Sequence, residues 1–453
     1  MSETVLTRGW MPLTLPQLDF WEEFALHPDQ PISTVAHYLD IDGVVDGAAL
    51  YDAIAQTVRE AEILSVRFRI PSGEQNPLQY CDPQQAPKVL QFDLRDRSDP
   101  LEAAQDVMQA DVRAKLDLLN DPVSAQWLLR LSETRYLWYI RAHHIILDGF
   151  GLLLIEQRCA QLYAHFLGHI DSGHAFYPFA SFLAEEEAYC ADQRYIDDRL
   201  FWTEYLKTST KLPIVHKGAE AYRAPGMYFQ CALSDDLCRD LQRTTAETRI
   251  GWPDLLVMLS AAYFFYHFPT MELASKQPLT LWLPFMSRWG SVSAHIPAML
   301  ANILPLRLSI EREETLAAFL KRLAGILRKQ RSHGRYRVEQ IAADQGMPKG
   351  SRYLFSPLVN VVPFNPPVFE GCNVRRNVLA NGPGDGFEIT FRGREDGSGL
   401  TLHIEVDPAL VSRDAFERHQ QNLPAFIERA LTPGALAAPV EDLCINLPAS
   451  LTA

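Results

Sequence analysis

Residues 141–151 of the chain read RAHHIILDGFG and combine three residue types that could do chemistry. The histidine pair His143 and His144 is followed by Asp148 and Gly149. A histidine exchanges protons near neutral pH, an aspartate can anchor a loop, and a glycine permits a tight turn. A string of the form H-H-x-x-x-D-G arises by chance in on the order of one in a thousand chains of this length, which favours a functional role over two buried structural histidines.

Three kinds of histidine chemistry need to be compared. A helical zinc site spaces its two histidines four residues apart, whereas these two are adjacent, and no other cluster of histidine and cysteine completes a ligand set. The sequence therefore predicts no metal site. A serine hydrolase of the Ser-His-Asp type is disfavoured because the chain has no G-x-S-x-G turn. Histidine-assisted acyl transfer remains.

The histidine pair lies at the end of a predicted strand. Residues 135–140, RYLWYI, are apolar and aromatic, and residues 149–168 have the apolar spacing of a helix. Neighbouring side chains on a strand point to opposite faces, so we expect one histidine to face the protein interior and the other to face a cavity. Asp148 and Gly149 are expected to close the turn between strand and helix.

Helical and extended patterns alternate along the rest of the chain, which predicts an α+β fold, with a sheet and helices on one face in each half. Asp46 is the expected N-cap of a helix over 47–62, strands are expected at 66–70, 125–132 and 135–144, and the polar stretch 168–179 is the expected boundary. A long helix is expected over 181–207. Further strands are predicted at 226–233, 278–285, 302–308, 353–363, 386–392 and 399–406, and further helices at 234–247, 253–268, 313–330 and 411–430.

The composition is that of a globular chain with room for more than one core, since 47% of its 453 residues are hydrophobic. The longest apolar stretch, residues 255–268, is shorter than the ~20 residues of a membrane-spanning helix and predicts a buried core helix. The first residues lack the basic and apolar segments of a secretion signal, so a cytoplasmic location without membrane attachment is expected. The seven cysteines form no C-x-x-C pair and are expected to be reduced.

The stretch HHIILDG at residues 143–149 resembles the H-H-x-x-x-D-G signature of the condensation domains of nonribosomal peptide synthetases. Nearly the whole chain shares the resemblance, through residues 14–26, 61–69, 176–183, 299–308, 333–341 and 353–364. It implies two subdomains similar to chloramphenicol acetyltransferase, over 1–172 and 173–453, that form a V-shaped pseudo-dimer with a central tunnel. It also implies a monomer.

Within this family, residues 141–158, 250–257, 281–292, 333–341 and 356–364 resemble the free-standing amide synthases of the vibriobactin type. The resemblance implies a stand-alone enzyme that transfers an aryl group, 2,3-dihydroxybenzoyl, from an aryl carrier protein thioester to a free polyamine in catechol siderophore biosynthesis. No cofactor is expected to be bound, because the substrate arrives on the phosphopantetheine arm of the carrier. The length of the chain, without a carrier or adenylation motif, predicts that the carrier is a separate protein.

The resemblance also assigns roles to residues. His143, His144, Asp148 and Gly149 form the catalytic motif, with His144 in the active site and Gly149 leaving room for the pantetheine thioester. Asp148 is implied to be structural and to form an ion pair with Arg288, whose planar guanidinium suits a buried carboxylate. Trp289 and Asn360 are implied to contact the substrate in the tunnel. Each of these roles has an alternative. Arg288 could be a surface arginine, Gly149 a simple turn glycine, and Trp289 and Asn360 ordinary core residues.

The net charge of −14 disfavours nucleic acid as a partner and permits a cationic one such as a polyamine. Against this negative background, basic residues gather between 321 and 337. Since carrier proteins in this setting are typically acidic, the patch could steer docking, and it could equally be a solvated helix end. The residues predicted to dock the carrier are Arg328, Lys329, Arg331 and Arg335.

Two other functions remain open from the sequence. An acyltransferase of the same fold could use coenzyme A as donor or form an ester, since both reactions need a histidine in a tunnel. A catalytically silent module could also bind carrier proteins without forming a product.

Overall fold

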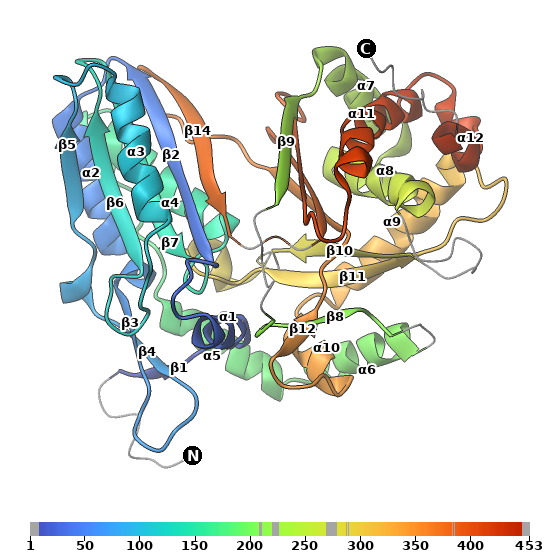
Figure 1. The fold of residues 1–453 in the computed structure, drawn as a ribbon, viewed down its shortest axis with the longest axis horizontal. Helices are drawn as coiled ribbons and strands as arrows, with labels where there is room; N and C mark the ends of the chain where they lie inside the picture. Colours follow the sequence, from blue (N-terminus) through green and yellow to red (C-terminus); the bar gives the residue numbers. More distant parts are fainter. Residues whose placement is uncertain are drawn as a thin grey trace. The chain divides into compact units, whose positions relative to one another are not determined.

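The computed structural model describes residues 9–207, 211–219, 226–268, 279–286, 288, 290–382, 384 and 386–445. The chain divides into two compact units. Unit 1 comprises Met1–Tyr195, Met286–Ala301 and Pro366–Pro383, and unit 2 comprises Ile196–Phe285, Asn302–Asn365 and Gly384–Ala453. Each unit contains its own sheet and helices (Figure 1), which confirms the α+β prediction.

The main sheet of unit 1 has five strands in the order β14-β2-β7-β6-β5. These are β14 (Cys372–Asn381), β2 (Thr34–Gly43), β7 (Arg135–His143), β6 (Ser124–Arg130) and β5 (Val89–Asp93). Only the β5–β6 pair is parallel. The late strand β14, orange in Figure 1, lies beside the early strand β2, blue, with Asn381 opposite Val35.

Helices cover both faces of this sheet. On one face, α2 (Gly47–Glu60) and α4 (Gly149–Phe166) share a core with Trp138 and Ile140 of β7. On the other, Ala104 and Met108 of α3 (Pro100–Val112) pack against Leu137 and Tyr139. The expectation of helices on one face was therefore wrong for unit 1. The reason is in the run RYLWYI, which presents apolar side chains on both faces and so requires cover on both.

The other elements of unit 1 lie outside the main sheet. Three short strands form a second sheet in the order β1-β4-β3, from β1 (Met11–Pro12), β4 (Leu78–Cys81) and β3 (Val66–Arg69). The helix α1 (Leu15–Leu26) follows β1. The predicted helix over 181–207 is in fact two helices, α5 (Phe179–Ala191) and α6 (Gln193–Lys207), separated by the extended backbone of Asp192. From Ile196 onward α6 belongs to unit 2.

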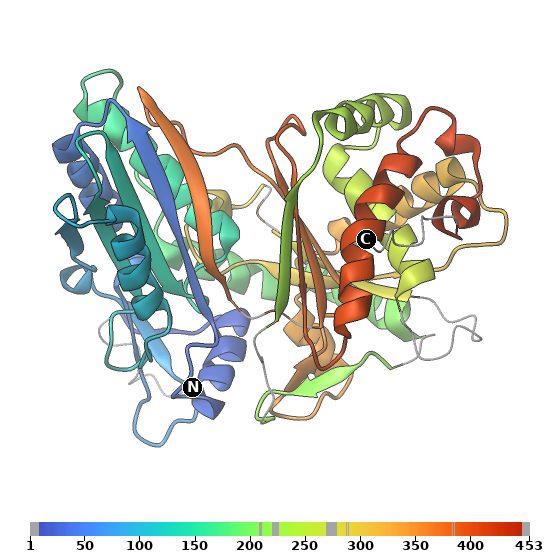
Figure 2. The same ribbon diagram turned by 45° about the horizontal axis from the view of Figure 1, so that its top comes forward.

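Unit 2 is built on a six-stranded sheet in the order β11-β10-β13-β15-β16-β9. Its strands are β9 (Met227–Ala232), β10 (Leu279–Phe285), β11 (Asn302–Leu308), β13 (Leu358–Pro363), β15 (Phe387–Gly393) and β16 (Thr401–Val406). The strand β13 is parallel to both of its neighbours. In Figure 2 the green edge strand β9 lies beside the red strand β16, in agreement with their antiparallel register. Five of the six strands were predicted within two residues of these bounds, and the sixth, β13, begins at Leu358 where residue 353 was expected.

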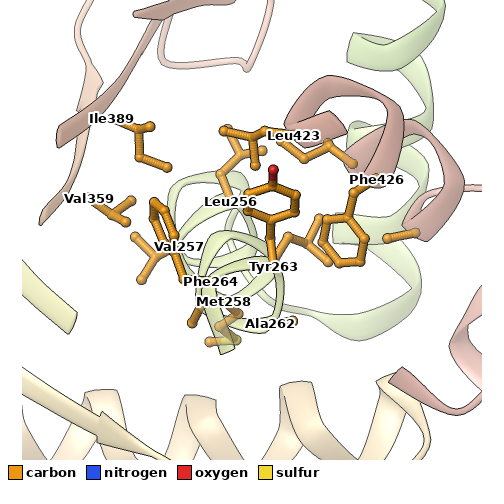
Figure 3. Close-up of a cluster of buried hydrophobic side chains, with 14 of the residues drawn as sticks. Leu256, Val257, Met258, Ala262, Tyr263, Phe264, Val359, Ile389, Leu423 and Phe426 are labelled. Atoms are coloured by element: carbon orange, nitrogen blue, oxygen red, sulfur yellow. The ribbon is translucent and has the colours of Figure 1, made fainter. Parts of the chain in front are cut away.

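One face of this sheet carries the core of unit 2. The apolar helix α8 (Trp252–His267) is the predicted core helix and is surrounded by α7 (Asp235–Thr248), α9 (Leu316–Ser332), α11 (Arg413–Ala430) and α12 (Val440–Ile445). Figure 3 shows Val359 and Ile389 of the sheet approaching α8 from one side and Leu423 and Phe426 of α11 from the other. The short helix α10 (Val338–Asp344) and the strand pair β8 (Ile214–His216) and β12 (Ser351–Tyr353) complete the unit.

The predicted boundary between residues 172 and 173 falls inside unit 1. Two later segments, Met286–Ala301 and Pro366–Pro383, also belong to that unit. The second segment joins unit 1 because β14 pairs along β2 by backbone hydrogen bonds, an interaction between segments remote in sequence that no local pattern indicates. The V-shaped arrangement and its tunnel stay predictions.

Among the described residues, no helix is long and apolar enough to cross a bilayer, and no group of three or more His, Cys, Asp or Glu could hold a metal ion. All seven cysteines are free thiols. The described helix after Asp46 begins at Gly47, and the Asp46 carboxylate accepts hydrogen bonds from the Ala48 and Ala49 amides, which confirms the predicted N-cap.

Candidate active site

The histidine pair lies at the end of the central strand β7. His143 is the last residue of β7 and pairs with Thr34 of β2, while its amide donates to Val123 O at 3.0 Å. The His144 amide, one residue beyond the strand, donates to Ser33 O at 2.7 Å. These backbone bonds fix both histidines to the core of unit 1.

His143 is a structural residue. It is 6% exposed, and its Nδ1 accepts a hydrogen bond from the Ile145 amide at 3.1 Å, so the ring proton lies on Nε2. Burial lowers the pKa of His143 to about 3, which keeps the ring neutral at physiological pH. His143 therefore closes the turn after β7 and does not exchange protons near neutral pH.

His144 has the opposite tautomer. Its Nδ1 lies 2.8 Å from Leu147 O. Because a carbonyl oxygen can only accept, Nδ1 carries the ring proton, and Nε2 is the unprotonated nitrogen that carries a lone pair. Phe20 of α1 stacks on the ring with centroids 5.1 Å apart and planes 17° apart. Burial lowers the pKa of His144, against the opposing effect of the Asp148 charge, so the ring is neutral at pH 7 and Nε2 is a base.

Asp148 organises the loop between β7 and α4. It is the N-cap of α4, and one carboxylate oxygen accepts from the Gly151 amide at 2.7 Å. The other accepts from the Leu300 and Ala301 amides at 3.0 and 2.9 Å. Burial alone would raise its pKa, but the charge of Arg288 and these amides hold the pKa below its usual value of 3.8. Asp148 is therefore a buried anion that ties α4 to a segment that lies 152 residues later in the chain.

The predicted ion pair of Asp148 with Arg288 is present. The Arg288 Nη2 atom donates to both carboxylate oxygens, at 2.9 and 2.8 Å, and both side chains are almost fully buried. The other terminal nitrogen of the guanidinium, Nη1, donates instead to Ser293 O and Ile296 O at 2.7 Å each. Arg288 also lies over the Phe150 ring at 5.0 Å. The pair holds the loop that follows Arg288 against the start of α4.

The model of the protein family described as "Condensation domain" matches residues 7–443 of the chain. The chain belongs to the condensation domain family. Condensation domains catalyse amide-bond formation and act on substrates tethered to carrier proteins, so this condensation domain is an acyltransferase. The described hydrogen bonds of Asp148 go to Arg288 and to backbone amides, which fits the predicted structural role of this residue.

Solved structures and curated sequences agree with this family. The condensation domain is similar to VibH, a condensation enzyme of nonribosomal peptide synthesis, with 34% identity and a TM-score of 0.85 over 94% of this chain and 100% of that one. A variant of the starter condensation domain of rhizomide synthetase RzmA, in complex with C8-CoA, is 26% identical with a TM-score of 0.82 over 97% of this chain and 98% of that one. Enterobactin synthase component F of Escherichia coli O157:H7 is 29% identical over 95% of this chain.

The condensation domain spans 33% of the length of that enterobactin synthase component and still less of two other curated synthases that it resembles. The similarity therefore concerns one part of those larger proteins.

The remaining predicted site residues are Gly149, Trp289 and Asn360. Gly149 is exposed, and a Cβ built on it would have no neighbour within 4 Å, so the space beside it is open and the fold itself does not require a glycine there. Trp289 lies outside the described residues. Asn360 lies half-buried on β13 of unit 2, opposite Thr390. The substrate-binding roles of Trp289 and Asn360 stay predictions.

The basic residues predicted to dock a carrier differ in availability. Arg328 and Lys329 are exposed near the end of α9, and the Lys329 ammonium lies 5.5 Å from the centre of the Phe201 ring. Arg331 is engaged by Asp254 of α8, with Nη1 2.7 Å from a carboxylate oxygen, and Arg335 is half-buried. Arg328 and Arg331 line a hollow of about 180 Å³ together with Arg249. The sequence patterns did not indicate that Arg249 lies beside the other two.

Three further residues of the candidate site were missed by sequence reasoning. Phe20 was only part of a longer matching segment, although its ring covers His144. Ser33 accepts from the His144 amide, and its hydroxyl donates to Glu23. Gly151 allows close packing, because a Cβ there would lie 3.1 Å from the Ala298 backbone. The second glycine of DGFG could have indicated Gly151, whereas no local signal pointed to Phe20 or Ser33.

Proposed function

We propose that this condensation domain is a free-standing amide synthase that transfers a 2,3-dihydroxybenzoyl group from an aryl carrier protein thioester to a free polyamine in catechol siderophore biosynthesis. The observation that carries the proposal is His144, whose Nδ1 is bound to Leu147 O so that Nε2 is a neutral base. Similarity to the whole length of VibH supports a self-contained catalytic unit. The match to enterobactin synthase component F supports a siderophore context. The aryl group and the polyamine come from the resemblance of the motif segments.

The chemical step forms one bond and breaks another. The lone pair of the amine nitrogen attacks the thioester carbonyl carbon and gives a tetrahedral intermediate. Collapse of the intermediate forms the amide C–N bond and breaks the C–S bond. The proton that leaves the nitrogen ends on the sulfur of the pantetheine thiol.

His144 is too weak a base to deprotonate an ammonium group outright. A primary ammonium has a pKa of ~10.4 and an ordinary imidazole ~6.5, so complete transfer is uphill by roughly 5 kcal/mol. Burial lowers the pKa of His144 and makes the transfer harder still. The amine therefore reacts as its neutral minor species. His144 Nε2 accepts a hydrogen bond from its N–H, orients the lone pair, and receives the proton as the intermediate forms.

We place carrier docking at the exposed basic residues Arg328 and Lys329 near the end of α9. Arg331 contributes less to this surface because its charge is already balanced by Asp254. Exposed cations attract an acidic partner and raise its association rate, and salt screens the attraction. The monomeric state and the cytoplasmic location predicted from the sequence belong to the same proposal.

The test is product formation from defined donors and acceptors. The purified chain is incubated with 2,3-dihydroxybenzoyl-loaded aryl carrier protein and a panel of diamines and polyamines, and the products are identified by mass spectrometry. We expect an amide with one or more polyamines and release of the free carrier thiol. Carrier binding without product for every acceptor would contradict the proposal and favour a silent docking module.

A second candidate donor has one supporting observation. The RzmA starter domain with which this chain shares its fold was solved in complex with C8-CoA. The assay is therefore repeated in parallel with aryl-coenzyme A as the donor and with alcohols as the acceptors. Faster product formation from aryl-coenzyme A than from the loaded carrier would assign this chain to the coenzyme A-dependent transferases, and an ester product would assign it to the ester-forming ones.

A further inference from the structure

Gly382, at the end of β14, lies against the imidazole ring of His144. A Cβ built on Gly382 would lie 2.6 Å from His144 Cδ2, 3.3 Å from Val35 Cγ1 and 3.4 Å from His144 Nε2. Real side chains do not approach this closely, so the backbone of residue 382 already occupies the space beside the ring. Gly382 also has a φ of +78°, a conformation that residues with a Cβ rarely adopt.

Strand pairing explains why a residue 238 positions after His144 reaches it. In the main sheet of unit 1, β2 lies between β7 and β14. At one end of β2, Thr34 pairs with His143 on one side, and Val35 pairs with Asn381 on the other. A register shift between Val378 and Ala380 inserts an extra residue just before this end, and such a bulge bends a strand locally. Gly382, the next residue after β14, is thereby brought beside His144.

The contact falls on the part of the ring that matters for proton transfer. Leu147 O holds the ring at Nδ1, and Phe20 covers one of its faces. Gly382 meets the ring at Cδ2, the carbon bonded to Nε2. The three contacts together restrict the rotation of the imidazole about its side-chain bonds. A neighbour that pushed on Cδ2 would change the direction in which the Nε2 lone pair points.

We propose that Gly382 is a positioning residue for acyl transfer, required because only a residue without a Cβ lets the His144 imidazole keep the orientation in which Nδ1 binds Leu147 O and Nε2 faces the reacting amine. The proposal rests on the proposed function, in which His144 Nε2 contacts the amine. A misplacement of about 1 Å in a catalytic group lowers the rate by on the order of 100-fold. We therefore expect Gly382→Ala to affect the chemical step more than substrate binding.

The experiment compares Gly382→Ala with a matched glycine variant. Gly168 has a φ of +81°, is exposed, and would have no neighbour within 4 Å of an added Cβ, so Gly168→Ala introduces the same backbone strain without a clash. We expect Gly382→Ala to lower kcat for amide formation by on the order of 100-fold with less than about a twofold change in the KM of the carrier. Gly168→Ala should lower Tm slightly and leave kcat within about twofold of the unchanged protein.

A double variant separates positioning from general damage. If Gly382 acts through the imidazole, adding Gly382→Ala to His144→Ala should lower the residual kcat no further than about twofold, because effects that act through one group are not additive. A further loss as large as that in the unchanged protein would overturn the proposal. Equal kcat for Gly382→Ala and Gly168→Ala would overturn it as well.

The same set of variants also tests the proposal if Gly382→Ala does not fold. If Gly382→Ala alone is unfolded by circular dichroism, the clash with the ring predicts that His144→Ala in the same chain restores folding. The Tm of this double variant should lie at or below that of Gly168→Ala, because Val35 Cγ1 still lies 3.3 Å from the added Cβ. An unfolded double variant would overturn the proposal. Full activity of His144→Ala alone would instead disprove the proposed function, since the catalytic role of the ring would then be absent.

Discussion

At the residue scale, the two histidines of the motif differ in the direction of their hydrogen bonds. His143 accepts at Nδ1 from an amide, and His144 donates at Nδ1 to a carbonyl. The prediction that one histidine is structural and the other accessible follows from strand alternation, but the strand ends at His143, and it is the turn after it that assigns the roles. A single backbone amide and a single carbonyl thus decide which ring can accept a proton.

The first prediction concerns the size of the His144 effect. We expect His144→Ala to slow single-turnover amide formation by less than ~10⁴-fold, because an orienting residue contributes less than a dominant acid-base residue. The measurement is amide formation from loaded carrier under single-turnover conditions. His174→Ala, which removes an exposed histidine of the same unit, is the control and should leave the rate unchanged.

The pH dependence of the rate of amide formation tests whether His144 must be neutral to act. Because the amine reacts in its neutral form, the rate of both the unchanged protein and His144→Ala should rise with pH up to the pKa of the ammonium group. Only the neutral ring accepts a proton, and burial places the pKa of His144 below 6.5, so the unchanged protein should show an additional, steeper fall below that value. His144→Ala should lack this additional fall. A complete loss of activity at every pH would contradict the orienting role.

At the scale of elements, the placement of β14 depends on a buried charge cluster. Glu156 of α4 is fully buried and contacts His37 of β2 at 2.5 Å and Arg376 of β14, whose Nε donates at 3.0 Å. Burial alone would raise the pKa of Glu156, but the charges of Arg376 and His37 lower it. The cluster therefore joins β14, β2 and α4, and so supports the strand that Gly382 directly follows.

We predict that Arg376→Ala destabilises the protein by about 3–5 kcal/mol, because it leaves a buried carboxylate whose remaining described ionic partner is His37. The neighbouring Arg375 is the matched control, since its side chain is 76% exposed and lies 3.4 Å from Asp40. Arg375→Ala should change stability by less than about 1 kcal/mol. Urea denaturation followed by circular dichroism measures both.

The destabilisation should depend on pH in a defined direction. A carboxylate with a lowered folded pKa contributes stability above its unfolded pKa of about 4.3, and the contribution is lost as pH falls through the folded value. The difference between Arg376→Ala and the unchanged protein should therefore be largest near pH 7 and shrink below about pH 4. A difference that stays constant with pH would show that Arg376 acts by packing alone.

At the scale of the whole molecule, charge is unevenly distributed. The chain carries a net charge of −14, yet Arg328 and Lys329 are exposed on α9, beside a hollow that Arg249 also lines. An acidic carrier would be repelled by most of such a surface and attracted by this part of it. The patch is smaller than the sequence suggested, because Asp254 balances the charge of Arg331.

We expect Arg328→Glu with Lys329→Glu to raise the KM for the loaded carrier by about tenfold at low salt, with little effect on kcat. The increase should diminish as salt is added, since exposed charges are screened within about 10 Å at 0.1 M ionic strength. Arg413→Glu, which reverses an exposed arginine on α11 of the same unit, is the control. Equal carrier KM values for the two variants at low salt would exclude this docking surface.

The sequence alone determined what depends on neighbours along the chain. The N-cap at Asp46, the apolar helix α8 and five of the six strands of the main sheet of unit 2 follow from periodicity and capping, since a few adjacent residues carry these signals. The rare spacing of His143, His144 and Asp148 indicated acyl transfer before any fold was known. The Asp148–Arg288 pair came from resemblance to a family, not from spacing.

Tertiary structure decided what depends on remote partners. The pairing of β14 with β2, the cover of α3 on the second face of the sheet, and the approach of Gly382 to His144 each join segments that share no local pattern. Closing long loops loses chain entropy and is favourable only when complementary edges and faces meet, so such contacts are selected by the whole packed core. The sequence therefore indicated His144 as the candidate catalytic residue, whereas it gave no signal for the contacts that hold its ring in place.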